Sequence, residues 1–180
     1  EARFVRFTIS ATNQSEPCLD ELEVFSADDH RNIALASAGG VPTASGTFPN
    51  SDIHRLEHIN DGRYGNERSW ISNEPGKGWV QIEWPTATRI DGVAWSRDRI
   101  EPPRYNDRLA IGYEIAVSLD GQHWTMVADS KDRRQAGLEI PIELNPKRAG
   151  IQSRLSRLRS ELKSLIAEPM VYAGKFAAPG

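Results

Sequence analysis

The feature that most constrains the fold is a strict alternation of apolar and polar residues. In the stretch ARFVRFTIS, Val5, Phe7 and Ile9 occupy every second position, so they share one face of an extended strand. The stretch YEIAVSL repeats the pattern with Tyr113, Ile115, Val117 and Leu119. Because one face of each stretch is apolar and the other polar, we predict two half-buried antiparallel strands.

Six further segments have the composition of short strands: residues 22–25, 32–36, 78–84, 90–96, 123–128 and 138–144. Turn sequences separate them, including Asp61-Gly62, Glu74-Pro75-Gly76 and Asp120-Gly121. In the last of these, Gly121 can supply the positive φ of a hairpin turn. About eight short strands at this spacing predict an all-β fold, a β-sandwich or jelly roll, over residues 1–145.

The periodicity changes after Pro146. Apolar residues then recur at spacings of four, three, four and three, as Ile151, Leu155, Leu158, Leu162 and Leu165. This predicts a C-terminal amphipathic α-helix over residues 146–168, ending before Pro169, followed by an extended connector over 169–180. The apolar stripe has two interpretations: it docks on the sandwich or a neighbouring domain, or it pairs with a partner helix as a short coiled coil.

Size and charge exclude several classes of protein. A chain of 180 residues suits one core plus an appendage, and no apolar run approaches the roughly 18 residues of a membrane span. The net charge of −3 is uneven: residues 147–167 carry +5, which leaves −8 for residues 1–146. An acidic body of this kind argues against nucleic acid as a partner.

Cys18 is a single cysteine, so it can form neither an internal disulfide nor a cysteine-based zinc site. We expect a half-buried small apolar residue at a turn, with a reactive thiol as the alternative. The chain starts at Glu1 and ends in a Gly- and Pro-containing tail, so we expect it to be an excised or processed piece.

Five phrases follow in order from Asn32: NIALASAGGVPTASG, HINDGRYGNERSWISN, GWVQIEW, IDGVAWSRDR and NDRLAIGYEIAVSLDGQHWTMV. With ARFVRF and ELEVF they resemble the discoidin or coagulation-factor C-type domain family, which is galactose-binding-like and includes family-32 carbohydrate-binding modules. The resemblance covers about residues 2–130 and implies an eight-stranded β-sandwich jelly roll.

The order of the phrases departs from that family. A phrase like aRYvRf followed by a short E-[LI]-x-[VF] strand closes the family's domain, whereas ARFVRF and ELEVF come first here. We expect a circular permutation, because strands that lie close together can be reconnected without changing the packed product. The alternative is that residues 2–25 are the end of a preceding repeat.

The C-terminal YAGKFAAPG, with the order of the phrases, resembles segments of large planctomycete proteins that also carry cytochrome-c-type haem domains. This resemblance implies an extracytoplasmic location, periplasmic, cell-surface or secreted. The CxxCH motif of haem attachment does not occur in these 180 residues.

The family resemblance also implies a structural calcium ion beside the ligand-binding end. The matching positions are Asp61 and Glu21 as side-chain ligands, with Asn66 and Ser69 near the loop. A hard cation prefers several oxygens gathered around a tight turn. Ser69 lies two residues farther from Asp61 than the family's usual spacing. The alternative is that Asp61 caps its own turn and Glu21 is a solvated strand residue.

For a glycan site, the resemblance implies Arg97 or Arg99 together with Asn106. Neighbouring candidates are Arg104, the loop histidines His54 and His58, and a platform from Tyr64, Trp95 and Tyr105. Guanidinium and amide groups bind sugar hydroxyls, and an aromatic face packs on the apolar side of the ring. Two alternatives stay open: the alternating SRDRIEPPRYNDR is a self-neutralising loop, and each histidine serves packing.

The remaining tryptophans are assigned to packing, namely Trp70, Trp79 and Trp124, with Trp84 buried or at the rim. An enzyme is disfavoured, because the sequence contains no phosphate-binding glycine loop, GxSxG elbow or HExxH helix. We therefore expect a noncatalytic carbohydrate-binding module that targets a larger extracytoplasmic protein to a glycan. The alternative is an interdomain scaffold that docks on other domains of the parent chain and binds no sugar.

Overall fold

The computed structural model describes residues 1–134, 154–155 and 157–162. The chain divides into two units, Glu1–Ala136 and Gly137–Gly180. The strands of the first unit are β1 (Ala2–Thr12), β2 (Cys18–Leu19), β3 (Glu21–Ser26), β4 (Val41–Ala44), β5 (Trp70–Ile71), β6 (Gly78–Thr88), β7 (Ile90–Ser96), β8 (Ala110–Ser118) and β9 (Thr125–Asp129). Three single-turn 3₁₀ helices lie between strands: Ala36–Ala38, Leu56–His58 and Asn66–Arg68.

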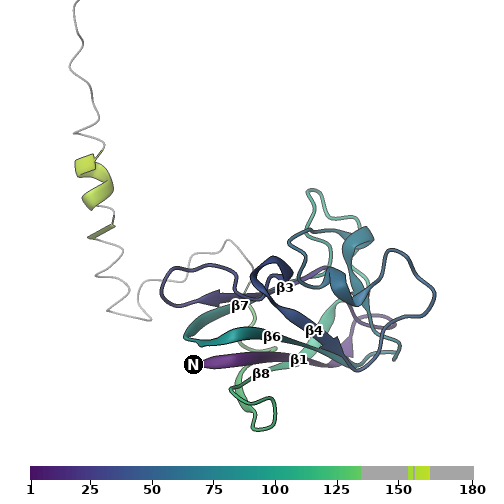
Figure 1. Ribbon diagram of the computed structural model, residues 1–180. Coiled ribbons are helices and arrows are strands. Elements are labelled where there is room, and N and C mark those ends of the chain that lie inside the picture. The colour runs from purple at the N-terminus through teal and green to yellow at the C-terminus, as the bar shows by residue number, and fades with distance from the viewer. Residues whose placement is uncertain (135–153, 156, 163–180) are drawn as a thin grey trace, which may run out of the picture. The chain divides into compact units, whose positions relative to one another are not determined.

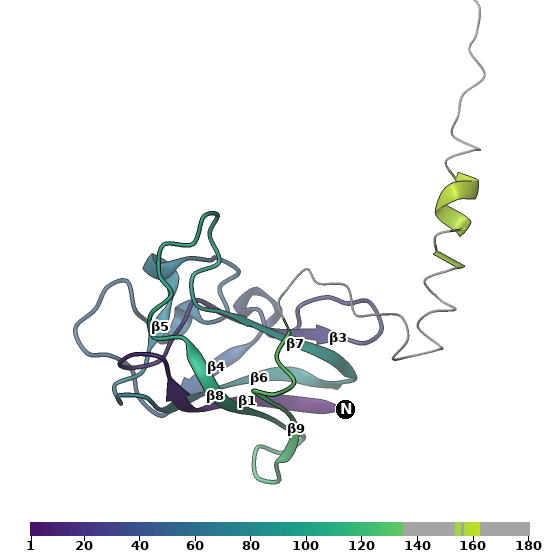
Figure 2. The same cartoon turned by 180° about the vertical axis from the view of Figure 1, so that it is seen from behind.

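The larger sheet has five antiparallel strands in the order β4-β6-β1-β8-β9 (Figures 1 and 2). Its centre is β1, which pairs with β6 on one side and β8 on the other. In this register Phe7 lies opposite Val80 of β6 and Ile115 of β8. The first strand of the chain is therefore an integral part of the sheet.

A second layer comes from the antiparallel pair β3 and β7, whose side chains close over the inner face of the large sheet. The contact is aromatic: the Phe7 ring stacks on Tyr113 with centroids 4.7 Å apart and meets Trp95 of β7 at 5.4 Å. Around them lie the buried aliphatic side chains of Val5, Ile9, Leu22, Val24 and Ile82. Burial of these apolar surfaces is the main stabilising contribution to the unit.

A third, short pair joins β2 to β5, with Leu19 opposite Trp70. It lies toward the end of the unit where long connections gather, as the two opposite views show (Figures 1 and 2). These connections are residues 45–58, 61–69 and 97–108. They carry nearly all of the predicted site residues.

The all-β prediction is confirmed, since β1, β3, β6, β7, β8 and β9 occur where strands were predicted. Val5, Phe7 and Ile9 are buried, as their alternation required. Leu119 differs, because β8 ends at Ser118 and Leu119 is exposed. Three short strands, β2, β4 and β5, were not predicted.

The predicted strand at residues 32–36 is wrong. Asn32 makes an isolated bridge to Phe25, and a 3₁₀ helix begins at Ala36. The Asn32 side chain accepts hydrogen bonds from the backbone amides of Val24 and Ala34, at 3.2 and 3.1 Å. This side-chain pairing takes the place of a strand ladder. The strand predicted at residues 138–144 lies outside the described residues.

Two of the tryptophans assigned to packing stand at the surface of the large sheet. Trp70 and Trp84 are buried, whereas Trp79 and Trp124 are half-buried. The Arg6 guanidinium lies between them, 4.9 Å from the Trp79 ring centroid and 4.1 Å from that of Trp124. They therefore pack on a cation rather than in the core.

In the second unit, residues 154–155 and 157–162 are helical. Leu155, Leu158 and Leu162 are exposed there, and Arg157 pairs with Glu161 one turn later at 3.0 Å. The other residues of the predicted 146–168 helix and the 169–180 connector lie outside the described residues. Among the described residues, no helix has the length and apolarity needed to cross a membrane.

Phe7→Ala is expected to lower the free energy of unfolding by about 3–5 kcal/mol, because it opens a cavity between the two layers. Urea denaturation followed by tryptophan fluorescence measures the change. Phe48→Ala is the matched control: the Phe48 side chain is 40% exposed, so its loss is expected to cost less than 1 kcal/mol. Equal losses in the two variants would contradict this assignment of the core.

Candidate functional site

The loop end is fixed by a buried carboxylate, Asp20, between β2 and β3. One of its oxygens accepts the Ser96 hydroxyl at the end of β7. The other accepts the backbone amides of Gly65 and Arg99, at 2.7 and 2.8 Å. Because these two residues belong to different loops, Asp20 joins the 61–69 loop to the 97–108 loop.

Asp98 makes a second connection between the same loops. Its Oδ1 accepts the Asn66 amide at 3.1 Å, and its Oδ2 accepts the amides of Arg104 and Tyr105 at 2.8 and 2.9 Å. Buried carboxylates that accept several N–H groups are strongly held. The sequence analysis selected neither Asp20 nor Asp98. For Asp98, the alternation of Arg and Asp in SRDR was the sequence feature that pointed to an ion-pairing role.

Arg97 is buried, with 5% of its surface exposed. Its Nε and one terminal nitrogen donate to the backbone and side chain of Asp107, both at 2.9 Å, and the other donates to Asn66 Oδ1 at 3.0 Å. The guanidinium also lies 5.5 Å from the ring centroid of Tyr105. Its donors are thus directed at the protein, and it backs an aromatic ring.

Arg99 contacts a second ring, but its side chain is 48% exposed, whereas that of Arg97 is buried. The Arg99 guanidinium lies 4.5 Å from the Tyr64 centroid and donates to Glu23 Oε2 at 2.7 Å. The Tyr64 hydroxyl donates to the other oxygen of Glu23 at 3.1 Å. Burial, followed by the charge of Glu23, raises the pKa of Tyr64, so its hydroxyl stays a donor at neutral pH.

Tyr64 and Tyr105 nevertheless stay partly open to solvent, 38% and 46% exposed. Arg63 and Arg104 stand beside them in sequence, and within the described residues their side chains make no hydrogen bond or ion pair. Asn106 is exposed, and its backbone carbonyl accepts the Asn13 side chain at 2.7 Å. The loop end therefore presents two ring surfaces flanked by free guanidinium and amide donors.

Two predicted site residues turn away from this surface. Trp95 points into the interlayer core, where it meets Phe7 and Tyr113 at 5.4 and 5.3 Å. His58 is buried, and its Nδ1 hydrogen-bonds to the carbonyl of Ile53 at 3.1 Å. Both therefore serve packing in this structure.

His54 faces a different partner, the buried Ser69. The Ser69 hydroxyl donates to the Asn66 carbonyl at 2.7 Å, and His54 Nδ1 lies 2.8 Å from the same hydroxyl oxygen. Since the hydroxyl hydrogen is used, His54 Nδ1 must donate, which leaves Nε2 as an acceptor. Burial, with the nearby charges of Arg97 and Arg108, lowers the pKa of His54, so this neutral form persists at neutral pH.

Cys18 is fully buried rather than half-buried, and burial raises its pKa to about 11. A thiol with this pKa is protonated at neutral pH and is a poor nucleophile. This disfavours the reactive-thiol alternative.

The structure brings Glu21 and Asp61 together at the turn preceding Gly62. Glu21 is fully buried; its Oε1 accepts the Gly62 amide at 3.1 Å, whereas its Oε2 has no partner. Burial, with the charges of Asp61 and Glu23 among the further causes, raises the pKa of Glu21 to about 8. Asp61 pairs with Arg68 and accepts the Arg63 amide at 2.8 Å.

The other two predicted calcium ligands lie in a different network. Asn66 Oδ1 accepts Arg97, and the Ser69 hydroxyl bonds to Asn66 and His54. Throughout residues 1–134, 154–155 and 157–162, no group of three or more His, Cys, Asp or Glu side chains is arranged to hold a metal ion. A calcium ion at Glu21 and Asp61 would therefore also need oxygen ligands from backbone carbonyls, neutral side chains or water.

The chain was compared with family models, curated proteins and solved structures, and none of them matches it. The assignment of function therefore rests on the geometry of the loop end.

Asp20→Ala is expected to lower the free energy of unfolding by about 2–4 kcal/mol, because it leaves the Gly65 and Arg99 amides buried without an acceptor. Asp28→Ala, at an exposed carboxylate, is the control and is expected to cost less than 0.5 kcal/mol. Urea denaturation measures both. If the two variants lose equal stability, the joining of the loops by Asp20 is not a main support of the fold.

Glu21→Gln tests the buried carboxyl through pH. Because the pKa of Glu21 is about 8 when folded against 4.5 ordinarily, the folded chain binds a proton that the unfolded chain releases between these values. Its contribution therefore makes stability fall as pH rises from about 4.5 past 8. With a calcium chelator present, we expect the variant to be close to the parent near pH 5 and to exceed it by roughly 4 kcal/mol at pH 9, since each unit of pKa shift corresponds to about 1.4 kcal/mol.

The measurement is a set of urea denaturations from pH 5 to 9, with the exposed Glu67→Gln as control. Parallel stability curves for the parent and Glu21→Gln would show that Glu21 does not titrate in this way.

Proposed function

We propose that the domain predicted at residues 1–145 is a noncatalytic carbohydrate-binding module, a circularly permuted discoidin-like jelly roll. It targets a larger extracytoplasmic protein to a glycan. The observation that carries the proposal is the pair of partly exposed rings, Tyr64 and Tyr105, each in contact with an arginine that is itself paired with a carboxylate. Such rings offer a rigid stacking surface at low entropic cost.

The donors around these rings suit a hydroxylated ligand. Arg63, Arg104 and Asn106 carry exposed planar polar groups that match pairs of sugar hydroxyls. Arg97 and Arg99, proposed from sequence as direct contacts, are then positioning residues that hold Tyr105 and Tyr64. Binding to so shallow a surface is expected to be modest.

The position of β1 supports permutation over the alternative of a preceding repeat. The strand is central in its sheet, between β6 and β8, and β3 provides the pairing partner of β7. Residues 2–25 thus complete the same unit as the later strands. A remnant of another domain would have no reason to fill these positions.

The proposal includes a structural calcium ion, because the ion would provide a partner for the buried Glu21 carboxylate. Its buried, unpartnered Oε2 beside Asp61 is an arrangement that a divalent cation stabilises by neutralising the two carboxylates. When bound, calcium would tie the start of β3 to the 61–69 loop. Calcium and a protonated Glu21 are competing solutions, so we expect calcium affinity to rise as pH increases through about 8.

A scaffold that binds no sugar is the second candidate, and one observation favours it. Five arginines of the loop end are already paired with carboxylates: Arg55, Arg68, Arg97, Arg99 and Arg108. A self-neutralised surface of this kind is suited to docking on other domains of the parent chain, and the tyrosine rings with the exposed groups beside them argue for a glycan.

The deciding experiment is a glycan-array screen of the 180-residue chain with calcium and with chelator, followed by titration calorimetry on each hit. Tyr64→Ala is expected to weaken binding about tenfold, because it removes a stacking surface worth about 1–1.5 kcal/mol. Tyr64→Phe keeps the ring and is the matched control, with affinity within about threefold of the parent.

Calcium is expected to raise the melting temperature and to strengthen binding, and Glu21→Gln to abolish both effects. An absence of binding across neutral, acidic and algal polysaccharides would favour the scaffold. If calcium does not change the melting temperature, the proposed calcium site is rejected, whereas the proposed glycan binding is unaffected.

A further inference from the structure

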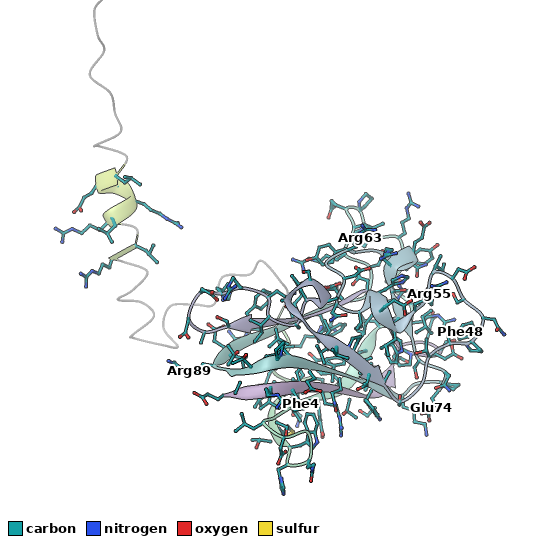
Figure 3. The ribbon with its side chains drawn as sticks, viewed as in Figure 1. Phe4, Phe48, Arg55, Arg63, Glu74 and Arg89 are labelled. Carbon is teal, nitrogen blue, oxygen red and sulfur yellow. The ribbon has the colours of Figure 1, made fainter. Side chains whose placement is uncertain are left out.

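We infer that the outer face of the five-stranded sheet binds a second copy of this chain, so that two sheets pack face to face about a two-fold axis. On β1 this outer face consists of Phe4, Arg6 and Thr8, which alternate with the buried core residues, and it continues onto β6, β8 and β9. Phe4, labelled in Figure 3, packs against the Trp124 ring with centroids 6.3 Å apart. The inference goes beyond the proposed glycan binding and does not depend on it.

The outer face presents the residue types that are enriched at protein interfaces, namely tryptophan, methionine and arginine. Trp79 and Trp124 are half-buried and hold the Arg6 guanidinium between them, and Met126 is 59% exposed. Water displaced from such surfaces favours association with a partner that covers them. The face is therefore suited to contact with another protein surface.

The charges of the face are set up for pairing. Among the described residues, Arg6 and Glu114 are the outward charges of β1, β6 and β8 that have no oppositely charged partner, since Arg3 and Glu83 pair with each other. The Arg6 guanidinium donates to the neutral Gln81, through Nε at 3.1 Å and one terminal nitrogen at 2.7 Å. Its charge and that of the exposed Glu114 thus remain to be matched by a partner.

The strand register arranges these residues on two crossing lines. Trp79 and Glu114 lie in one row across the sheet, on either side of β1, and Arg6 and Met126 lie in the row two residues away. We call the line from Arg6 to Glu114 the charged diagonal and the line from Trp79 to Met126 the apolar diagonal. With about 3.4 Å per residue along a strand and about 4.8 Å between strands, the two diagonals cross at their midpoints, at nearly a right angle.

This crossing makes the face complementary to itself. A two-fold axis along the apolar diagonal exchanges the two ends of the charged diagonal. Arg6 of one copy then faces Glu114 of the other, and the reverse, which gives two equivalent ion pairs. Trp79 and Met126 lie on the axis, so each meets the same residue of the second copy. An isologous interface requires this self-complementarity, which identifies the occupant as a second copy.

The rest of the surface is less suited to a second copy. Of the two edge strands of the sheet, β4 contains Pro42, which has no N–H to donate, and β9 has an irregular register around Val127. Both features oppose pairing of edge to edge. The charge of −8 on residues 1–146 makes two copies repel each other, whereas the outward charges of β1, β6 and β8 balance.

The test is sedimentation equilibrium of the 180-residue chain over a range of concentrations, where we expect a monomer–dimer equilibrium. Arg6→Glu and Glu114→Arg each place like charges across the interface, so each is expected to weaken the dimer at least tenfold. The double variant Arg6→Glu/Glu114→Arg restores opposite charges and is expected to return to within about threefold of the parent. Glu67→Arg, at an exposed carboxylate outside this face, is the control and is expected to leave the dimer unchanged.

Urea denaturation of each variant checks that it is folded, because Arg6 also packs between two rings. If Arg6→Glu is unfolded, Glu114→Arg decides alone: a weakened dimer supports the inference and an unchanged one rejects it. A chain that stays monomeric up to about 1 mM also rejects it. A dimer that Leu158→Glu abolishes and Glu114→Arg does not would assign association to the exposed leucines of the second unit, and would likewise reject the outer face. Each of these outcomes leaves the proposed glycan binding to be decided by the array.

Discussion

The Asp20 carboxylate is the contact on which the arrangement of the loop end depends. It is fully buried and lies at the junction of the two layers, between β2 and β3. Its two oxygens accept hydrogen bonds from β7 and from the 61–69 and 97–108 loops. A buried carboxylate that lacked these donors would be strongly destabilising, so the fold and the positions of the loops are established together. Together with Asp98, Asp20 thus fixes the loops that carry Tyr64 and Tyr105.

The arginines of the loop end show how one residue type can serve a binding surface indirectly. Each of Arg97 and Arg99 is fixed by a carboxylate and lies against a tyrosine ring. Their charge is largely cancelled, and what they contribute is rigidity. The rings and the unpaired groups beside them are then the parts that remain able to meet a ligand. Because these two arginines are paired with carboxylates, they are less able to bind a ligand directly and better able to hold the tyrosine rings in position.

The strands could be read from the sequence because alternation reports which face is buried, as for Val5, Phe7 and Ile9. Short pairs such as β2 and β5 could not, since two residues carry no period. The loop end was predicted as a region but not in detail. Whether Arg97 faces solvent or Asp107, and whether Glu21 is solvated or buried, depends on contacts between residues far apart in the chain. The strand predicted at residues 32–36 was wrong for a related reason. The Asn32 side chain accepts backbone hydrogen bonds that a neighbouring strand would otherwise have accepted.

The central place of β1 has a consequence for how the protein is made. Within this unit, β1 precedes both of its partners, β6 and β8, in the chain, and the pairing of Phe7 with Ile115 spans most of the described unit. Pairings between distant segments fold slowly, because the intervening chain must be ordered before they form. Until residue 118 has left the ribosome, β1 lacks its second neighbour, β8, and the sheet around Val5, Phe7 and Ile9 is incomplete. Newly made chains therefore depend on protection from aggregation for longer than chains whose central strand is made last.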